Sequence, residues 1–535
     1  MRPDVVELDR ISDYPDYWAA RRPTAEAMVL DTLRLTYAEL AAAVDRYARA
    51  MFAAGVRRGD RVAVLCTPRP EGLICFLAAA RLGAMFTGLN LRFKLDELAY
   101  VVADSMPRLL IALPQFESRD YRLDLRVLAD EHRSIEQVIT LFEAVPGLSR
   151  SLDAFLTAGE SIDGDAYARA VDTVEPEDPV LLVYTSGSSG RPKGAMISHR
   201  GLCHCSRNQC DHWWADPLHV LDNLTISNMF GVGDLFCYCL VGGGTTVFME
   251  RFDPAGVLAT IERERVTVWG QVATMLQLAL AHQDATSADI SSLQLIFWAG
   301  APAPRELITR LQAICPNLST NYGLTETVAG VTYAKIGSSL DVLADTAGAP
   351  DPRYELRVVS ADGRVLGDGE EGEVQVRGRC RMIGYFNKPE ATAAMIDTEG
   401  WLHTGDLGLR RPDGNYRIVG RLSDMYKSGG FNVYPREIEI LLEGYPGVSL
   451  AAVVGVPDGL YGEVGWAYLA PKPGAVLKEP ALSAWCRERL ANFKVPKRFI
   501  IGDQLPMLAV GKIDKAALKR AARGELDGNG PDRPE

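Results

Sequence analysis

The sequence lacks any long uninterrupted hydrophobic segment. Its longest apolar runs, such as Leu73 to Ala80, are far shorter than the roughly 20 residues that a membrane-spanning helix needs. The stretch from Met1 to Asp9 is acidic where a signal peptide would be basic and then apolar, and no apolar export segment follows Arg21-Arg22. We therefore expect neither a membrane span nor an export signal.

Basic charge and cysteine are also scarce. The 57 Lys and Arg residues are outnumbered by 69 Asp and Glu residues, and the net charge of −12 gives no overall electrostatic reason to bind nucleic acid or an anionic membrane. An anionic substrate would instead need a local cationic site. Ten cysteines among 535 residues are too few for a disulfide framework, which favours a reducing, cytoplasmic location.

The chain has an ordinary apolar content, and it is longer than a chain that folds around a single hydrophobic core. The hydrophobic fraction of 47% excludes a mostly disordered chain, and 535 residues predict two or more lobes. The first third alternates helix and strand signals. We expect helices at Thr36–Met51, Glu71–Leu82 and Leu95–Ala103, and strands at Arg61–Cys66, Leu109–Ala112, Val180–Tyr184, Thr267–Val272 and Leu293–Trp298.

This βαβ rhythm predicts parallel sheets with helices on their faces. From about residue 348 the pattern changes to short strands between the Asp362-Gly363 and Asp413-Gly414 turns, which is typical of hairpins. We expect an α/β fold: a large body over residues 1–420 with a β-rich part at about 348–420, and a small α/β domain over residues 421–535. The tail, residues 524–535, is expected to be disordered.

A glycine-rich loop directly follows one of the predicted strands. It reads Thr185-Ser-Gly-Ser-Ser-Gly-Arg-Pro-Lys193-Gly194. Glycine lets backbone N–H groups approach a ligand closely, hydroxyls add donors and Lys193 adds charge, so the loop suits a polyphosphate. It is not a Walker A loop, because Pro192 precedes the lysine and Gly194 follows it, which disfavours a P-loop ATPase.

Six ordered motifs carry a resemblance. After this loop come Tyr322-Gly-Leu-Thr-Glu326, Gly372-Glu373 leading to Met382-Ile-Gly-Tyr385, Trp401-Leu-His-Thr-Gly-Asp406, Gly420-Arg421-Leu-Ser-Asp424 running into Lys427-Ser-Gly-Gly-Phe-Asn-Val-Tyr-Pro435, and Gly511-Lys512-Ile-Asp-Lys515. In these blocks the chain resembles the adenylate-forming superfamily of acyl-CoA synthetases, luciferases and peptide-synthetase adenylation domains. The resemblance covers Thr36 to Lys515. It implies two doubly wound subdomains and a β-barrel-like subdomain in the body, and a mobile C-terminal domain.

The resemblance also implies roles in ATP binding. The loop is expected to hold the β- and γ-phosphates, Thr325 to contact the α-phosphate and Glu326 to bind Mg²⁺. Asp406 is expected to accept hydrogen bonds from the ribose hydroxyls, Tyr322 to stack on adenine and Arg421 to touch the ribose or phosphates. The expected ATP contacts are Thr185, Ser186, Gly187, Ser188, Ser189, Gly190, Lys193, Gly300, Ala301, Pro302, Tyr322, Gly323, Thr325, Asp406, Arg421 and Lys512. The expected catalytic residues are Lys512, Thr325, Glu326 and Lys193.

In the small domain the resemblance implies a hinge and a tunnel. Lys512 is expected to pair with the carboxylate and the α-phosphate, and Ser423 to be the hinge about which the domain rotates between two half-reactions. Lys427, Ser428, Gly429 and Gly430 are expected to line the pantetheine tunnel, although paired glycines also form simple β-turns.

The acyl pocket is expected to include Phe230, Gly231, Asp234, Trp269, Trp298, Ala299, Gly300 and Gly323. Gly231 stands where relatives often place His or an aromatic residue, so we expect a larger cavity unless Trp269 or Trp298 fills it, and hence a bulky or long acid. Amino-acid-activating relatives place Asp at this position, so an α-amino acid is disfavoured. For Asp234 a helix cap, and for Trp298 a place in the core, are the simpler interpretations.

These features predict an ATP- and Mg²⁺-dependent carboxylic acid–CoA ligase. Two alternatives remain open: a stand-alone adenylating enzyme that transfers its product to a carrier protein or a second ligase, and a catalytically silent nucleotide-binding protein. A homodimer also remains open. A zinc site at Cys203, His204, Cys205, Cys210 and His212 is not expected, because Cys203 and Cys205 would point apart on a helix.

Overall fold

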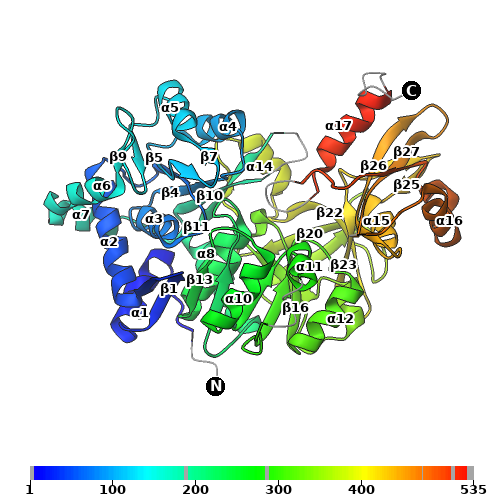
Figure 1. Cartoon of the computed structure of the whole chain (residues 1–535), viewed down its shortest axis with the longest axis horizontal. Coiled ribbons are helices and arrows are strands. Elements are labelled where there is room, and N and C mark those ends of the chain that lie inside the picture. The colour runs from blue at the N-terminus through cyan, green and yellow to red at the C-terminus, as the bar shows by residue number, and fades with distance from the viewer. Residues whose placement is uncertain (1–4, 186–190, 283–287, 473, 508–512, 527–535) are drawn as a thin grey trace.

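The computed structural model describes residues 5–185, 191–282, 288–472, 474–507 and 513–526. They form a large body and a small C-terminal body beside it, which carries α15 to α17 (Figure 1). No helix within these ranges has the length and apolar character that crossing a bilayer requires.

The first sheet of the large body holds the predicted phosphate loop. Its central strands are parallel, while β11 runs antiparallel to β10 and β21 runs antiparallel to β11. In spatial order the strands are β21 (Gly384–Tyr385), β11 (Lys193–Ser198), β10 (Pro179–Thr185), β4 (Met85–Leu89), β3 (Arg61–Leu65), β5 (Leu109–Ala112), β8 (Gln137–Thr140) and β9 (Arg150–Ser151).

The second sheet combines an early hairpin with later strands. In spatial order it holds β18 (Ala349–Pro350), β17 (Gly330–Tyr333), β16 (Leu318–Gly323), β15 (Leu295–Trp298), β14 (Val268–Gln271), β12 (His219–Asp222), β13 (Thr245–Phe248), β1 (Glu26–Leu30) and β2 (Leu33–Thr36). Six neighbouring strands of this sheet, β16, β15, β14, β12, β13 and β1, are parallel to one another, as the βαβ rhythm predicts.

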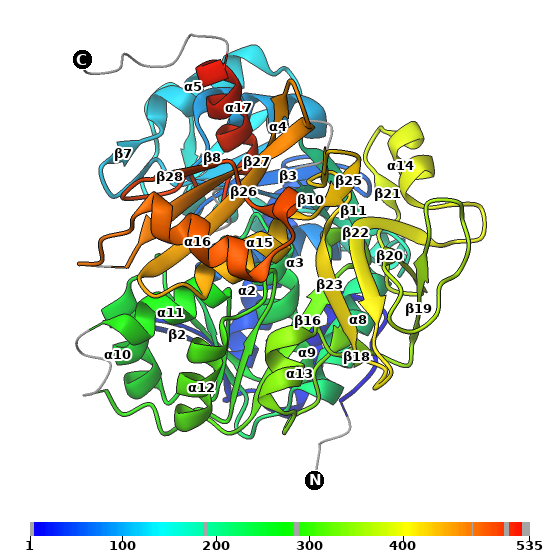
Figure 2. The ribbon, with the colours of Figure 1, turned by 90° about the vertical axis from the view of Figure 1, so that its right-hand side faces the viewer.

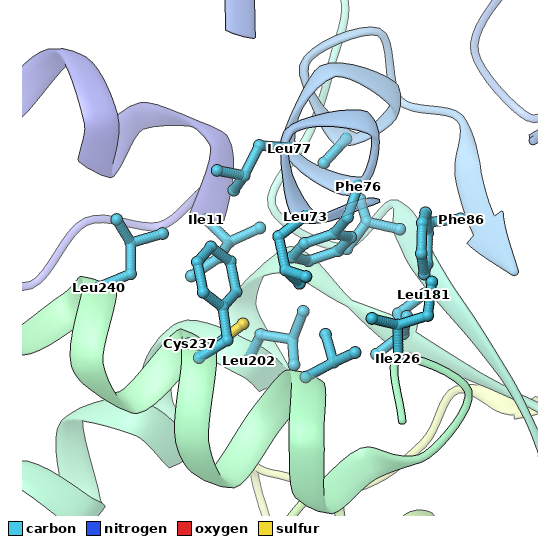
Figure 3. Close-up of a cluster of buried hydrophobic side chains, with 14 of the residues drawn as sticks. Ile11, Leu73, Phe76, Leu77, Phe86, Leu181, Leu202, Ile226, Cys237 and Leu240 are labelled. Carbon is cyan, nitrogen blue, oxygen red and sulfur yellow. The ribbon is translucent and has the colours of Figure 1, made fainter. Parts of the chain in front are cut away.

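Helices cover both faces of each sheet. The largest core cluster lies between the two sheets, where strand residues such as Val64 and Phe297 meet α2 (Tyr37–Ala53), α3 (Pro70–Arg81), α8 (His199–His212) and α9 (Tyr238–Gly242). Figure 3 shows this cluster, with Leu73 and Phe76 of α3 near Leu202 of α8. The outer face of the first sheet packs on α4 (Leu95–Ser105) and α5 (Arg122–Glu131). The outer face of the second sheet packs on α10 (Pro254–Glu264), α11 (Ala273–Ala281) and α12 (Arg305–Ile314).

The antiparallel sheet begins where the sequence pattern changes. Its strands are β19 (Tyr354–Val359), β20 (Gly372–Gly378), β22 (Leu402–Arg410) and β23 (Tyr416–Arg421), and the hairpins predicted at Asp362-Gly363 and Asp413-Gly414 are present. Smaller helices complete the body: α1 (Tyr14–Arg21), α6 (Leu152–Ala158), α7 (Gly164–Asp172), α13 (Leu340–Asp345) and α14 (Pro389–Met395).

The small body is a sheet covered by helices (Figure 2). It contains β24 (Tyr426–Ser428), β25 (Phe431–Val433), β26 (Val448–Asp458), β27 (Gly462–Pro471) and β28 (Arg498–Ile501), with α15 (Pro435–Glu443), α16 (Glu479–Arg489) and α17 (Lys515–Leu526).

The expected disordered tail is wrong at its start. Residues 524–526 continue α17, since Leu518 and Ala522 bury one face of the helix and Glu525 forms an ion pair with Arg498 of β28. The remaining tail, 527–535, lies outside the described residues.

Candidate active site

The two ends of the phosphate loop lie side by side. Thr185 ends β10 and pairs across the strands with Lys193, the first residue of β11. Ser186, Gly187, Ser188, Ser189 and Gly190 lie outside the described residues. Because the pairing is antiparallel, the residues on either side of the loop, Thr185 and Lys193, lie together at one end of the sheet and bring a hydroxyl and an ammonium group there.

Helix α4 holds both ends of this loop. The Tyr100 hydroxyl donates to the backbone oxygen of Pro192 at 2.7 Å, and the Tyr184 hydroxyl donates to Asp104 Oδ2 at 2.9 Å. Lys388 forms an ion pair with the other oxygen of Asp104. Burial, followed by the Asp104 carboxylate, raises the pKa of Tyr184, so this hydroxyl stays protonated and can donate.

Glu326 lies directly beside the base of the loop. Its Oε1 accepts hydrogen bonds from Thr185 Oγ1 at 3.2 Å and from the Tyr385 hydroxyl at 2.7 Å. Glu326 follows β16 in a short 3₁₀ turn, Thr325–Thr327, and it is 8% exposed. The structure thus brings Glu326 to the base of the loop beside Thr185, although the two residues are 141 positions apart in the sequence.

A close backbone approach shapes the chain just before Glu326. A Cβ on Gly323 would lie 2.0 Å from the backbone oxygen of Ala329, so only glycine fits there. The expected contacts Ala299, Gly300, Ala301 and Pro302 follow β15, the strand beside β16. They therefore lie in a loop at the carboxyl ends of the parallel strands, as Tyr322 and Gly323 do. Ligands of open α/β sheets bind at this end.

Asp406 is engaged on both carboxylate oxygens. Arg421 Nε lies 3.0 Å from Oδ1, and the Tyr322 hydroxyl donates to Oδ2 at 2.8 Å. Asp406 is buried in β22 beside Arg421 of β23, and its backbone N–H donates to Thr404 Oγ1. Burial and then the Asp406 carboxylate raise the pKa of Tyr322 well above its ordinary value, which keeps the phenol protonated.

The structure contradicts the expected effect of Gly231. A Cβ at this position would lie 2.8 Å from the backbone oxygen of Thr225, so it would point at a neighbouring loop and not into open space. Gly231 lies in a π-helix, Phe230–Cys237, whose backbone packs closely on that loop. The missing side chain therefore permits close packing and does not enlarge a cavity.

The helix cap considered for Asp234 is also wrong. Asp234 lies inside the same π-helix, where the Gln209 amide of α8 donates to it. Burial raises the pKa of Asp234 to about 8.

The two tryptophans expected in the acyl pocket lie on the far face of the second sheet. Trp269 and Trp298 are fully buried in the cluster that packs on α10 to α12. Phe230 packs instead against the cluster between the sheets, with its ring 6.0 Å from that of Phe297. Since side chains alternate along a strand, Phe297 and Trp298 face opposite sides. The structure therefore does not bring Phe230 together with these tryptophans.

The predicted tunnel residues form a hairpin. Lys427 and Ser428 end β24, and Gly429 (φ 57°) and Gly430 (φ 85°) make the two-residue turn to β25. Positive φ at both central residues explains the paired glycines. Ser423, the predicted hinge, is exposed in the turn between β23 and β24, and Lys512 lies outside the described residues.

The sequence interpretation missed several residues that support the site. Tyr385, Tyr100, Asp104 and Lys388 contact its groups from other elements. Tyr385 lies in one of the six motifs, but which group its hydroxyl contacts depends on strand pairing and could not be inferred from spacing. Among the described residues there is no group of three or more His, Cys, Asp or Glu side chains arranged to hold a metal ion.

Comparison with known proteins identifies the family. A model described as AMP-binding enzyme matches residues 15–386, and one described as AMP-binding enzyme C-terminal domain matches residues 437–512. The chain is 37% identical over 514 residues to a feruloyl-CoA synthase from Amycolatopsis, covering 94% of this chain and 98% of that one. It is 36% identical over 498 residues to the 3-[(3aS,4S,7aS)-7a-methyl-1,5-dioxo-octahydro-1H-inden-4-yl]propanoyl:CoA ligase of Rhodococcus jostii, covering 91% and 94%.

A solved structure agrees over nearly the same length. The o-succinylbenzoate CoA synthetase of Bacillus subtilis, in complex with its acyl-adenylate intermediate, matches with a TM-score of 0.81 and 29% identity, covering 95% of this chain and 98% of that one. The chain therefore belongs to the AMP-binding enzymes, the adenylate-forming superfamily. Within it the chain lies in the acyl-CoA ligase branch and is an AMP-forming acid–thiol ligase.

Proposed function

We propose that this enzyme joins a bulky, ring-bearing carboxylic acid to CoA in two steps. The acid carboxylate first attacks the α-phosphorus of ATP, which gives an acyl-adenylate and pyrophosphate. The CoA thiol then attacks the acyl carbon, which gives the thioester and AMP. The observation that carries this proposal is the meeting of Thr185, Lys193 and Glu326 at one end of the first sheet.

The first step brings two anions together, so it needs oriented donors and positive charge. Lys193 and Thr185 at the base of the glycine-rich loop are positioned to bind the β- and γ-phosphates, and Thr325 the α-phosphate. Asp406 is positioned to accept hydrogen bonds from the ribose hydroxyls. Each carboxylate oxygen has a second lone pair, so Asp406 can accept from the ribose while Tyr322 and Arg421 stay in place.

The residues at Glu326 fit a magnesium ion. The described partners of its carboxylate are two neutral hydroxyls on Oε1, and no described basic side chain forms an ion pair with it. A nearly buried carboxylate without a cationic partner suits a hard cation that also takes phosphate oxygens. Glu326 would hold the ion, which when bound supplies positive charge to the phosphates.

The small domain completes each step in this proposal. Residues 421–535 rotate about Ser423 relative to residues 1–420, so that Lys512 serves adenylation and the Lys427–Gly430 hairpin serves thioester formation. Positive φ at Gly429 and Gly430 gives a narrow turn without side chains, which suits passage of the pantetheine arm.

The relatives support the type of acid. The names of the two relatives described above contain ring-bearing acyl groups, feruloyl and a bicyclic propanoyl group. Neither of these acyl groups belongs to an α-amino acid, which disfavours amino acids as substrates.

The direct test is acid-dependent pyrophosphate release over aliphatic, aromatic and polycyclic acids, with and without CoA. We expect release with a ring-bearing acid and a thioester only when CoA is added. Thioester formation on a carrier protein alone would favour a stand-alone adenylating enzyme. No release with any acid, together with ATP binding, would favour a silent nucleotide-binding protein.

The variant Lys512→Ala tests whether Lys512 serves adenylation and not thioester formation. Removing a single preorganised donor of this kind costs about 10²–10³ in rate, so we expect adenylation to fall by this factor. Thiolysis of a supplied acyl-adenylate should change less than about threefold, since that step does not use the ammonium group. Equal losses in both half-reactions would contradict the assignment.

A further inference from the structure

We infer that Tyr385 is a positioning residue for Glu326, and that its hydroxyl orients the carboxylate toward the metal–nucleotide complex. This inference rests on the proposed function, because it concerns how Glu326 is presented to MgATP. It assigns a role to a side chain that contacts both Glu326 and Lys193.

Tyr385 is held in place by strand pairing. It lies on β21, the two-residue edge strand of the first sheet, and pairs with Ala195 of β11. Its backbone N–H donates to Thr392 Oγ1 at 2.8 Å, and the next residue, Phe386, donates to the backbone oxygen of Gly194. The ring is 7% exposed, so the side chain has little freedom to turn away.

The hydroxyl of Tyr385 makes the shorter of the two hydrogen bonds on Glu326. It donates to Oε1 at 2.7 Å, while Thr185 Oγ1 donates to the same oxygen at 3.2 Å. Among the described residues, no hydrogen bond is made to Oε2. The carboxylate is therefore fixed through one oxygen while the other remains available.

A second contact joins Tyr385 to the phosphate loop. Lys193 Nζ lies 5.2 Å from the centroid of the Tyr385 ring, within the range of a cation–π contact. The ring thus restrains the loop lysine and the hydroxyl restrains Glu326. Replacing Tyr385 by Phe separates the two, because it removes only the hydroxyl.

The test measures the binding of ATP to the full-length chain by calorimetry, with Mg²⁺ and with a chelator. A hydrogen bond to a charged group is worth enough to change an equilibrium about tenfold, so Tyr385→Phe should weaken MgATP binding about tenfold. Metal-free ATP should bind within twofold of the wild-type affinity, since its contact with Lys193 is intact. Unchanged MgATP binding, or equal losses with and without metal, would overturn the inference.

A matched control distinguishes this role from loss of any buried tyrosine hydroxyl. Tyr167, on α7, is 5% exposed and donates to Asp45 Oδ1 at 2.9 Å, so it has the same chemistry at a different place. Tyr167→Phe should change neither affinity. A Mg²⁺-specific loss in this variant as well would overturn the inference.

Two further variants test the route through Glu326. In a Glu326→Gln background, Tyr385→Phe should add less than a twofold effect, because groups acting through one contact are not additive. Thr392→Val removes a backbone anchor of Tyr385 and should give a smaller loss that is also Mg²⁺-specific, which tests the role even if Tyr385→Phe folds poorly. Additive losses, or a loss in Thr392→Val that does not depend on Mg²⁺, would overturn the inference.

The wild-type chain separates failure of this inference from failure of the proposed function. If the wild-type chain shows no preference for MgATP over ATP, the magnesium assignment in the proposed function fails. If it shows a preference that Tyr385→Phe retains, only the present inference fails.

Discussion

Asp406 illustrates how single side chains in this site serve two purposes. In the structure its carboxylate holds Tyr322 and Arg421, and in the proposed function it also receives the ribose. A residue with both roles contributes to the stability of the body and to nucleotide affinity. These two contributions can be measured separately.

We expect Asp406→Asn to weaken ATP binding about 10- to 100-fold, because a charged acceptor is replaced by a neutral one. It should also lower the melting temperature, since the ion pair with Arg421 is lost. Calorimetry and thermal unfolding provide the two measurements. The matched control is Glu355→Gln, which removes an exposed ion pair with Arg377 on neighbouring strands and should change neither value appreciably. ATP affinity that survives Asp406→Asn would contradict the ribose role.

At this scale the sequence predicted which residues lie together better than it predicted the shape of their surroundings. Motif order predicted that Thr185, Glu326 and Lys193 act together, and the fold brings them together. The expected effect of Gly231 was wrong, and Trp298 lies in the core on the far face of the second sheet, as the simpler interpretation held, and not in an acyl pocket. Spacing does not reveal which backbone approaches a glycine or which side of a strand an aromatic ring occupies. Tyr385 was missed for the same reason, since its partner is 59 residues away in the chain.

At the scale of elements, sequence patterns predicted helix starts and strand bounds where these depend on neighbouring residues. The helix predicted to start at Thr36 is present as α2, and both hydrogen bonds of a Thr36–Glu39 capping box fix its start. Strand β5 has the predicted bounds. The π-helix Phe230–Cys237 could not be predicted, because it depends on tertiary packing and not on a local pattern.

The end of β12 supplies a pH-dependent prediction. Asp222 is 2% exposed, burial raises its pKa from 3.8 to about 8, and its described hydrogen bond comes from the backbone N–H of Leu224. The folded chain keeps this proton up to about pH 8, while the unfolded chain releases it near pH 4. This group therefore lowers the free energy of unfolding progressively as the pH rises through that window.

Asp222→Asn removes this effect while keeping an acceptor for Leu224. The variant should gain stability relative to wild type between pH 5 and pH 8, with a slope approaching about 1.4 kcal/mol per pH unit. Urea unfolding at several pH values measures the difference. A difference that stays constant across the window would contradict the buried, protonated state of Asp222.

At the scale of the whole molecule, the junction near Ser423 is the place where the two bodies are joined. Leu422 donates its backbone N–H to the oxygen of Gly405 in the large body, and Asp424 lies 3.6 Å from Lys515 in the small one. The proposed rotation thus has to occur within a few residues, between contacts that belong to different bodies.

We expect Ser423→Pro to alter the balance between the half-reactions, because proline fixes φ at the proposed hinge. The rates of pyrophosphate release and of acyl-adenylate thiolysis should change by factors that differ about tenfold or more, with MgATP affinity retained. Single-turnover measurements of each half-reaction provide the test. Ser423→Ala is the control and should leave the ratio of rates unchanged. An unchanged ratio in Ser423→Pro would contradict the hinge assignment.

The strand order of the large body has a consequence for how the protein is made. The hairpin β1–β2 ends at Thr36, yet its parallel neighbour β13 begins at Thr245, and the first sheet receives its edge strand only with Tyr385. On the ribosome, the emerging hairpin therefore has no parallel partner until more than two hundred further residues have been synthesised. Neither sheet can be completed by a nascent chain that stops before Ala349, so the large body reaches its full strand pairing late in translation and depends on the exposed early strands staying free of other chains until then.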